Sequence, residues 1–199
     1  MVKIARWGAM LAAAAALTAC NESPEHRLVS AALHGDVAEV RTALAAKVRV
    51  NARSDGGETA LLVASEFCHP DVVAVLIAGG ADVNERSADT RHRGLDGETP
   101  LIEAAGADNG GCPAAAKALI AAGADVNAHK SDGVTALELA ANEGALDVAK
   151  LLVAAGADVN GASSGNTPLY STLGASPAGA SSSGRAAVAR FLRAHGGHE

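Results

Sequence analysis

The heptapeptide AAGADVN occurs twice, at residues 121–127 and 154–160, so the same seven letters return after 33 positions. The shorter sequence GADVN also ends at Asn84. Self-similarity at a fixed period of a few tens of residues is typical of repeat architectures, in which each unit packs only on its neighbours. This period constrains the fold before any other feature is considered.

Glycine residues are expected to end a helix in each unit. Gly80, Gly123 and Gly156 each follow an apolar helical pattern and precede Ala-Asp-Val-Asn. This is the place where a left-handed glycine stops a helix. Counting back 33 positions from Gly80 gives Lys47, which is followed by VRVN. The register of a further unit therefore persists there although its glycine does not.

Each unit also predicts two helices. Turn-forming stretches such as DGETP and DGVTA place a threonine at a helix N-cap, and Thr135 with Glu138 forms a candidate capping box. The expected N-caps are Thr59, Thr99, Thr135 and Thr167. In the second helix, apolar residues recur at i, i+3 and i+4. In four units these are Val40, Ala43 and Leu44; Val73, Leu76 and Ile77; Ala116, Leu119 and Ile120; Ala149, Leu152 and Val153. No single unit can bury this stripe, so the units are expected to stack.

A turn and two helices at this period, with TPL, GADVN and Thr-Ala-Leu variants in register, resemble the ankyrin repeat. The resemblance covers residues 25–197 and implies an all-α ankyrin-repeat solenoid of about five stacked helix-turn-helix units with hairpin fingers. The expected units are 25–54, 55–95, 96–131, 132–163 and 164–197. The family's histidine after TPL is absent from every unit, and the two terminal units depart from the pattern, as caps do.

The N-terminal residues predict a separate targeting segment. A basic start, a short run of small apolar residues and a small-residue cleavage site make residues 1–19 an export signal, too short to span a bilayer. The sequence LTAC at 17–20 resembles the lipobox of bacterial lipoproteins. It implies a tether at 20–24, with lipid on Cys20 as the sole membrane attachment. The lipoprotein resemblance and Asn21 further imply an outer-membrane location facing the periplasm. An ordinary signal peptide with a chance cysteine is the alternative.

Composition and motifs argue against several function classes. The net charge is -6 and no extended basic run occurs, which argues against nucleic-acid binding. Aromatic residues make up 2% of the chain, so Ala, Leu, Val and Ile must build the core. No nucleophile elbow, phosphate-binding glycine loop or Cys/His pair at zinc spacing is present. We therefore expect no enzyme activity, cofactor, metal or small-molecule substrate.

Two cysteines occupy comparable positions in neighbouring units. Cys68 and Cys112 both lie between the first and second helices of their units, and three extra residues precede Cys112. In an oxidising compartment, these residues could bring the two Cα atoms within about 7 Å and allow a disulfide. The alternative is that both are small apolar residues in a helix turn.

One finger is about seven residues longer than the period requires. Its candidate partner-binding residues are Arg86, Arg91, His92 and Arg93. Extended loops on rigid scaffolds often carry binding residues, and this basic finger in an acidic protein suits an acidic partner surface. A solvated insertion without a function is the alternative.

Glu66 and Phe67 are further candidates for partner contact. They lie at the end of a first helix, which lines the concave face in ankyrin proteins. An exposed aromatic residue there would be a candidate hot spot, whereas a buried one would belong to the core. Glu103, Asn142 and Glu143 occupy comparable helix positions and are weaker candidates.

Together these features predict a lipid-anchored periplasmic ankyrin-repeat protein that mediates protein–protein interaction as an adaptor or scaffold for an envelope protein. Two alternatives stay open. One is an immunity-like inhibitor of a secreted effector, and the other is a purely structural envelope lipoprotein. The identity of the protein partner is not encoded in any motif.

Overall fold

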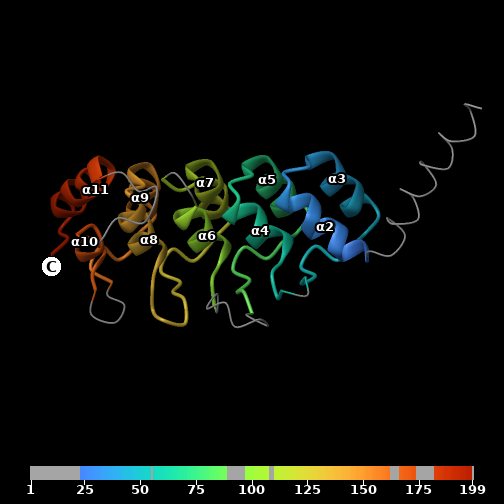
Figure 1. Ribbon diagram of the computed structural model, residues 1–199, viewed down its shortest axis with the longest axis horizontal. Helices are drawn as coiled ribbons and strands as arrows, with labels where there is room; N and C mark the ends of the chain where they lie inside the picture. The colour runs from blue at the N-terminus through green and yellow to red at the C-terminus, as the bar shows by residue number, and fades with distance from the viewer. Residues whose placement is uncertain are drawn as a thin grey trace, which may run out of the picture.

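The computed structural model describes residues 23–54, 56–88, 97–107, 110–161, 166–173 and 182–198. These ranges contain ten helices, which form five pairs stacked in a single row (Figure 1). The first members of the pairs, called the inner helices, are α2 (Pro24–Leu33), α4 (Ala60–Glu66), α6 (Pro100–Gly106), α8 (Ala136–Glu143) and α10 (Pro168–Ser171). The second members, called the outer helices, are α3 (Val37–Ala45), α5 (Pro70–Ala78), α7 (Pro113–Ala121), α9 (Leu146–Ala154) and α11 (Ser182–Ala194).

The inner and outer helices form two layers of one solenoid. Each inner helix contacts the next inner helix, and each outer helix contacts the next outer helix. The segments that join one pair to the next, called fingers, project from the side of the inner layer (Figure 1). Antiparallel bridges join Arg53 to Thr59 and His129 to Thr135 within two of them. This arrangement confirms the predicted all-α solenoid of about five units.

The helix starts follow the predicted N-caps. The hydroxyl groups of Thr59, Thr99, Thr135 and Thr167 each accept a hydrogen bond from the backbone N–H three residues later. The capping box is also confirmed, because the backbone N–H of Thr135 donates to Glu138 Oε2 at 3.0 Å. Helix α2 begins at Pro24, inside the predicted tether, because Ser23 caps it and proline is favoured at the first helical position.

The helix-ending glycines also take the predicted conformation. Gly80, Gly123 and Gly156 have φ angles of 86°, 90° and 93°. Lys47 lies at the equivalent place with φ 58°, although it carries a side chain. Left-handed backbone costs a non-glycine residue about 1 kcal/mol. The solenoid therefore imposes this turn even where the sequence does not favour it.

The core consists of leucine, valine and alanine, as the scarcity of aromatic residues requires. Leu76, Leu119, Leu152 and Leu192 are fully buried on four successive outer helices. The predicted stripe is confirmed in each of the four units: two of its three members are buried and the third is half-buried. Arg193 lies next to the buried Leu192 but is exposed, as expected of a terminal unit with one face in water.

An asparagine ladder explains why GADVN is repeated. Asn127 Oδ1 accepts from the backbone N–H of Asp158 in the next unit at 2.8 Å, and its Nδ2 donates to the carbonyl of Gly156 at 3.4 Å. Asn84 makes the same two contacts with the unit after it, at Asp125 and Gly123. The equivalent pair from Asn160 reaches His198 and Gly196 at the C-terminal end. The asparagine of each GADVN thus connects its own unit to the next.

The aspartate of GADVN acts within its own unit. Asp82 Oδ1 accepts from the backbone N–H of Asn84 at 2.9 Å, and Asp125 and Asp158 repeat this contact two residues on. This local turn accounts for the repeated aspartates. Among the described residues, no helix is both long and apolar enough to span a bilayer.

Candidate partner-binding surface

Exposed large apolar side chains lie on the inner layer of the solenoid. In the described part of the chain, four such side chains are exposed, by between 36% and 57%. They are Leu33, Phe67, Tyr170 and Leu173. Each belongs to an inner helix or to the turn that follows it. Apolar groups that remain in water on one side of a rigid scaffold mark a surface suited to binding a partner.

A pocket of about 430 Å³, called the inner pocket, lies between α4, α6 and α8. Glu66 and Phe67 line it from the end of α4, Glu103 from α6, and Glu143 from α8. Phe67 is 50% exposed, so it is not a core residue. The structure therefore brings the predicted candidates Glu66 and Phe67 together with two of the weaker candidates. The third, Asn142, lines a smaller neighbouring pocket.

An ion pair between two successive fingers lines the inner pocket. Lys130 Nζ lies 2.8 Å from Glu98 Oε1, and the two side chains are 17% and 7% exposed. Glu98 immediately precedes the N-cap of α6, and Lys130 lies in the finger before α8. Partial burial opposes the charge of Lys130, but its hydrogen bond and attraction to Glu98 raise its pKa above the ordinary value. This lysine therefore remains charged beside Glu98.

Glu103 has a strongly perturbed carboxyl group. Burial is the largest cause, and the hydrogen bond and charge of Glu98 add to it, raising the pKa of Glu103 from 4.5 to about 9. The charge of Glu66 acts in the same direction, while Lys130 opposes the shift. At neutral pH Glu103 therefore holds its proton. A neutral Glu103 can donate a hydrogen bond to Glu98, which an ionised carboxylate could not do.

Glu98 and Lys130 are not among the candidates predicted from the sequence. The available signal was weak: Glu98 stands one residue before the N-cap Thr99, and Lys130 lies in the next finger. The two side chains are neighbours only because successive fingers lie side by side in the stacked solenoid. Their pairing depends on the fold of both fingers.

The long finger is described only at its ends. Arg86 Nη2 donates to the backbone carbonyl of His129 in the following finger. Arg53 from the preceding finger pairs with Glu85 and donates to the carbonyl of Arg86 at 2.8 Å. Arg86 therefore has a structural role in joining fingers, and its contact with a partner stays a prediction. The other finger candidates, Arg91, His92 and Arg93, lie outside the described residues, as does Cys20.

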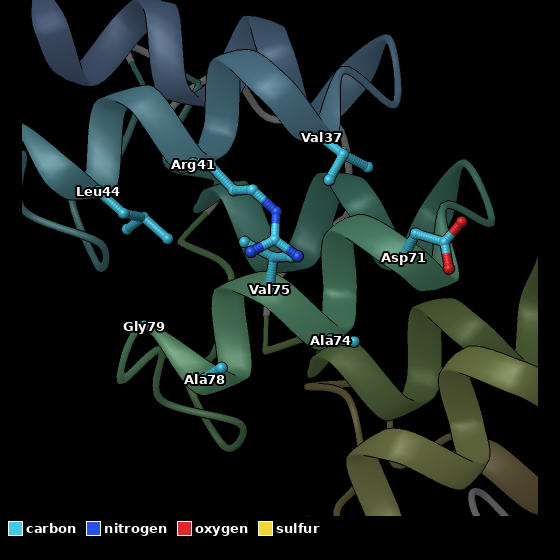
Figure 2. Close-up of a pocket in the computed structure, with 8 residues that line it drawn as sticks. All are labelled: Val37, Arg41, Leu44, Asp71, Ala74, Val75, Ala78 and Gly79. Atoms are coloured by element: carbon cyan, nitrogen blue, oxygen red, sulfur yellow. The ribbon is translucent and has the colours of Figure 1, made fainter.

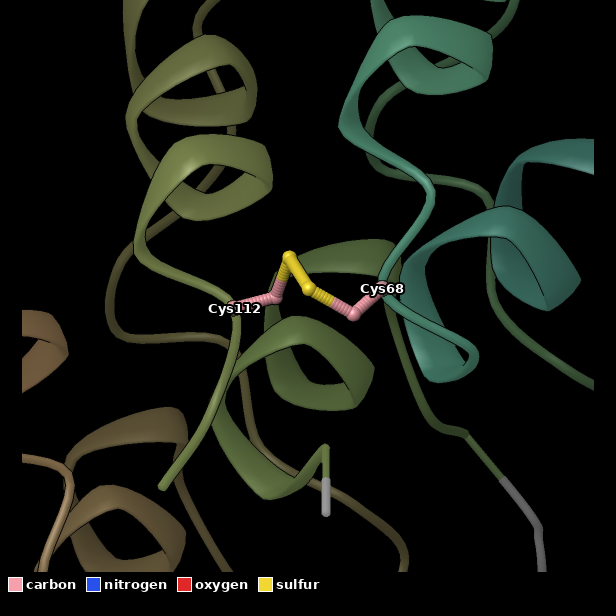
Figure 3. Close-up of a disulfide and its surroundings, with 2 residues drawn as sticks. All are labelled: Cys68 and Cys112. Atoms are coloured by element: carbon pink, nitrogen blue, oxygen red, sulfur yellow. A yellow bond between two sulfur atoms is a disulfide. The ribbon is translucent and has the colours of Figure 1, made fainter. Parts of the chain in front are cut away.

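A disulfide joins Cys68 to Cys112 (Figure 3), with their Cα atoms 5.4 Å apart. Cys68 follows α4 and Cys112 precedes α7, so the bond links two neighbouring units on the side where inner helices turn into outer ones. Cys68 has φ 51°, the left-handed conformation that Gly35 and Gly144 adopt at the equivalent junctions. The bond is the predicted pairing of the two cysteines in neighbouring units.

The outer layer carries a separate shallow groove between α3 and α5 (Figure 2). Small and aliphatic residues form most of its lining, and the side chain of Arg41 extends from α3 toward Val75 on α5. Its one described anionic group, Asp71, lies in the first turn of α5 (Figure 2). Unlike the inner layer, this groove has no exposed aromatic or large aliphatic side chain.

Metal-ligand clusters and nucleophiles are the groups that would indicate other chemistry in the described ranges. No group of three or more His, Cys, Asp or Glu residues there could hold a metal ion. Of the described residues that line the inner pocket, none is a histidine or a serine, and its cysteine, Cys68, is held in the disulfide with Cys112. Four glutamates and Lys130 line the pocket beside Phe67.

Comparison with known proteins agrees with this geometry. The family model for ankyrin repeats in three copies matches residues 86–163 and 107–198, and a second ankyrin-repeat model matches residues 28–77. No curated protein matches the chain. The matched ranges extend over most of the five helix pairs. The chain belongs to the ankyrin repeat family, whose repeats mediate protein–protein interaction.

Proposed function

We propose that this chain is a lipid-anchored periplasmic ankyrin repeat protein that acts as an adaptor or scaffold for an envelope protein, which it binds through its inner layer. The observation that carries the binding proposal is the distribution of exposed large apolar side chains, all of which, in the described residues, lie on that layer. Stacking holds these side chains on one rigid surface. Ankyrin repeats are typically non-enzymatic interaction modules, so the proposal includes no reaction.

Two features support the proposed location. Residues 1–20 have the composition of a bacterial lipoprotein signal, with Cys20 as the acylation site. The Cys68–Cys112 bond fits a compartment where disulfides persist, as they do in the bacterial periplasm. Lipidation is tested by feeding cells a fatty-acid probe. The wild-type chain should incorporate it and Cys20→Ser should not, whereas equal labelling of both would remove the lipoprotein proposal.

The binding proposal is tested by affinity capture of the exported, tagged chain from its native envelope. A Phe67→Ala, Tyr170→Ala variant removes two exposed aromatic side chains from the inner layer, and Arg41→Ala is the matched outer-layer control. One stoichiometric partner should be lost with the inner-layer variant and retained with the control. Equal capture by all three proteins would refute binding through the inner layer.

A third capture variant tests the long finger separately. Arg91→Ala, Arg93→Ala removes two predicted finger cations and leaves the inner layer unchanged. Loss of the partner with this variant alone would move the contact to the finger. If the captured partner is an enzyme whose activity falls on binding, the inhibitor alternative replaces the adaptor role.

A further inference from the structure

The inner pocket contains more anionic groups than cationic ones. Four carboxyl groups line it, those of Glu66, Glu98, Glu103 and Glu143. Lys130 is the one cationic side chain in the described lining, and its ammonium is already 2.8 Å from Glu98. Acidic clusters on protein surfaces are common and do not by themselves bind anything, so a second observation is needed.

That observation is the second carboxylate oxygen of Glu98. Lys130 pairs with Oε1, but Oε2 is buried and receives no hydrogen bond from an N–H or hydroxyl group of the described residues. The side chain as a whole is 7% exposed and lines the inner pocket. A buried carboxylate oxygen without a donor is costly. It therefore needs a hydrogen-bond donor that enters the pocket or a proton held close by.

Glu103 can provide that proton. Its pKa of about 9 keeps it neutral at neutral pH, and burial and its hydrogen bond with Glu98 are the leading causes. Two neighbouring carboxyl groups cannot easily both be ionised, so they share a proton. An external cation could take the place of that proton. When a cation arrives, the proton leaves and both carboxylates can accept hydrogen bonds from it.

We infer that the inner pocket binds an arginine side chain of the partner protein, with the guanidinium group held by Glu98 and Glu103 and its planar face against Phe67. The inference rests on the proposed function, since it names the group that the partner inserts into the inner layer. Arginine fits better than lysine for two reasons. Its planar fork donates to two carboxylates at once, and it stacks on aromatic rings. Phe67 is exposed at this pocket and supplies such a ring.

The affinity of the pocket for arginine should depend on pH. Among the described residues, the charged groups around Glu103 are Glu66 from α4, Glu98 from the segment before α6, Glu143 from α8 and Lys130 from the finger before α8. Asp132 acts on Lys130 in turn. Binding of a cation lowers the pKa of Glu103, so complex formation releases a proton. By linkage, affinity increases as pH rises toward the pKa of the free protein.

The test uses N-acetyl-L-argininamide as the probe and the oxidised full chain. Backbone amide NMR shifts are followed at about pH 6 and about pH 9, with N-acetyl-L-lysinamide as the comparison ligand. We expect saturable shifts in α4, α6 and α8, tighter at the higher pH by about tenfold. The argininamide should bind more tightly than the lysinamide. No saturable shift in these helices, or equal affinity for both ligands, overturns the inference.

Two variants distinguish specific binding at the inner pocket from nonspecific attraction of the cationic probe. Glu103→Gln resembles the neutral carboxyl in shape, so it should preserve the fold while abolishing both the tight binding and its pH dependence. Asp71→Asn removes one anionic group from the outer layer and should leave probe binding unchanged. Probe binding that is identical in wild type and Glu103→Gln overturns the inference.

The two proposals can fail independently. Partner capture that depends on Phe67 and Tyr170, together with no probe binding, overturns the arginine inference and leaves the proposed function standing. Specific probe binding without any captured partner supports the pocket chemistry and counts against the adaptor role.

Discussion

Replacing Asn127 with alanine tests whether the asparagine ladder stabilises the stack. The change removes one hydrogen bond of 2.8 Å to Asp158 and one of 3.4 Å to Gly156, both in the next unit. A typical intramolecular hydrogen bond contributes about 1 kcal/mol net, and the longer one is near the geometric limit. Asn127 is exposed, so water can replace both contacts in the variant. We therefore expect Asn127→Ala to lower the free energy of unfolding by about 1–2 kcal/mol.

Urea denaturation followed by far-UV circular dichroism measures this loss. The midpoint should fall while the slope stays constant, because the surface exposed on unfolding hardly changes. Asn127→Asp keeps the acceptor and removes the Nδ2 donor, so it should lose less than the alanine variant. Asn142→Ala is the matched control, since its amide donates within its own unit, to the neighbouring Glu143 at 3.4 Å. A loss from Asn127→Ala no larger than that from Asn142→Ala would refute the ladder argument.

Three further predictions concern stability. Reducing the Cys68–Cys112 bond, which closes a separation of 44 residues, should lower the free energy of unfolding by up to about 4 kcal/mol, measured by urea titration with and without a phosphine reductant. Lys47 has a left-handed backbone conformation that glycine adopts without a steric penalty. Lys47→Gly should therefore raise the melting temperature, whereas Lys47→Ala should not. Glu103 binds a proton in the folded state between pH 4.5, its ordinary pKa, and about 9, so stability should fall as pH rises through this window. A Glu103→Gln variant should lose that part of the pH dependence, and an unchanged profile would contradict the raised pKa.

The fold could be predicted from the sequence because its determinants are local. A threonine cap, a helix-ending glycine and an i, i+3, i+4 stripe are each readable within a few residues. Because these signals recur at the same spacing, the units could also be predicted to stack. The helix start at Thr135 and the left-handed turn at Gly123 needed no knowledge of any other unit. Lys47 was located only by counting from Gly80, and the structure gives it the glycine conformation.

The candidate site was less predictable because it depends on contacts between units. Glu66 and Phe67 could be chosen from their place at a helix end, but their grouping with Glu103 comes from the stacking of α4 on α6. The ladder role of Asn127 was also missed, since a single unit shows only a turn residue. Arg86 was assigned to partner binding by its charge, yet its guanidinium reaches the backbone of His129 in the next finger. A charged side chain in a repeat can thus serve the stack, and the sequence of one unit does not reveal which neighbour it meets.

The disulfide and the inner pocket have one residue in common, and this leads to a last prediction. Cys68 itself lines the pocket beside Phe67, and Cys112 lies just beyond α6, which carries Glu103. The bond therefore fixes the end of α4 relative to the unit that contains α6. Holding binding groups in place before the ligand arrives lowers the ordering cost of binding.

Cys112→Ser should therefore weaken argininamide binding at the inner pocket even under conditions where the variant is fully folded. Loss of one preorganising contact corresponds to about 1 kcal/mol, or about fivefold in affinity. The same NMR titration measures it, with circular dichroism to verify that the helices persist. Cys20→Ser is the matched control, because it removes a cysteine that is not part of the bond. Equal affinity in oxidised wild type and Cys112→Ser would mean that stacking alone positions Phe67 and Glu103. In that case the disulfide would stabilise the solenoid without shaping its binding surface.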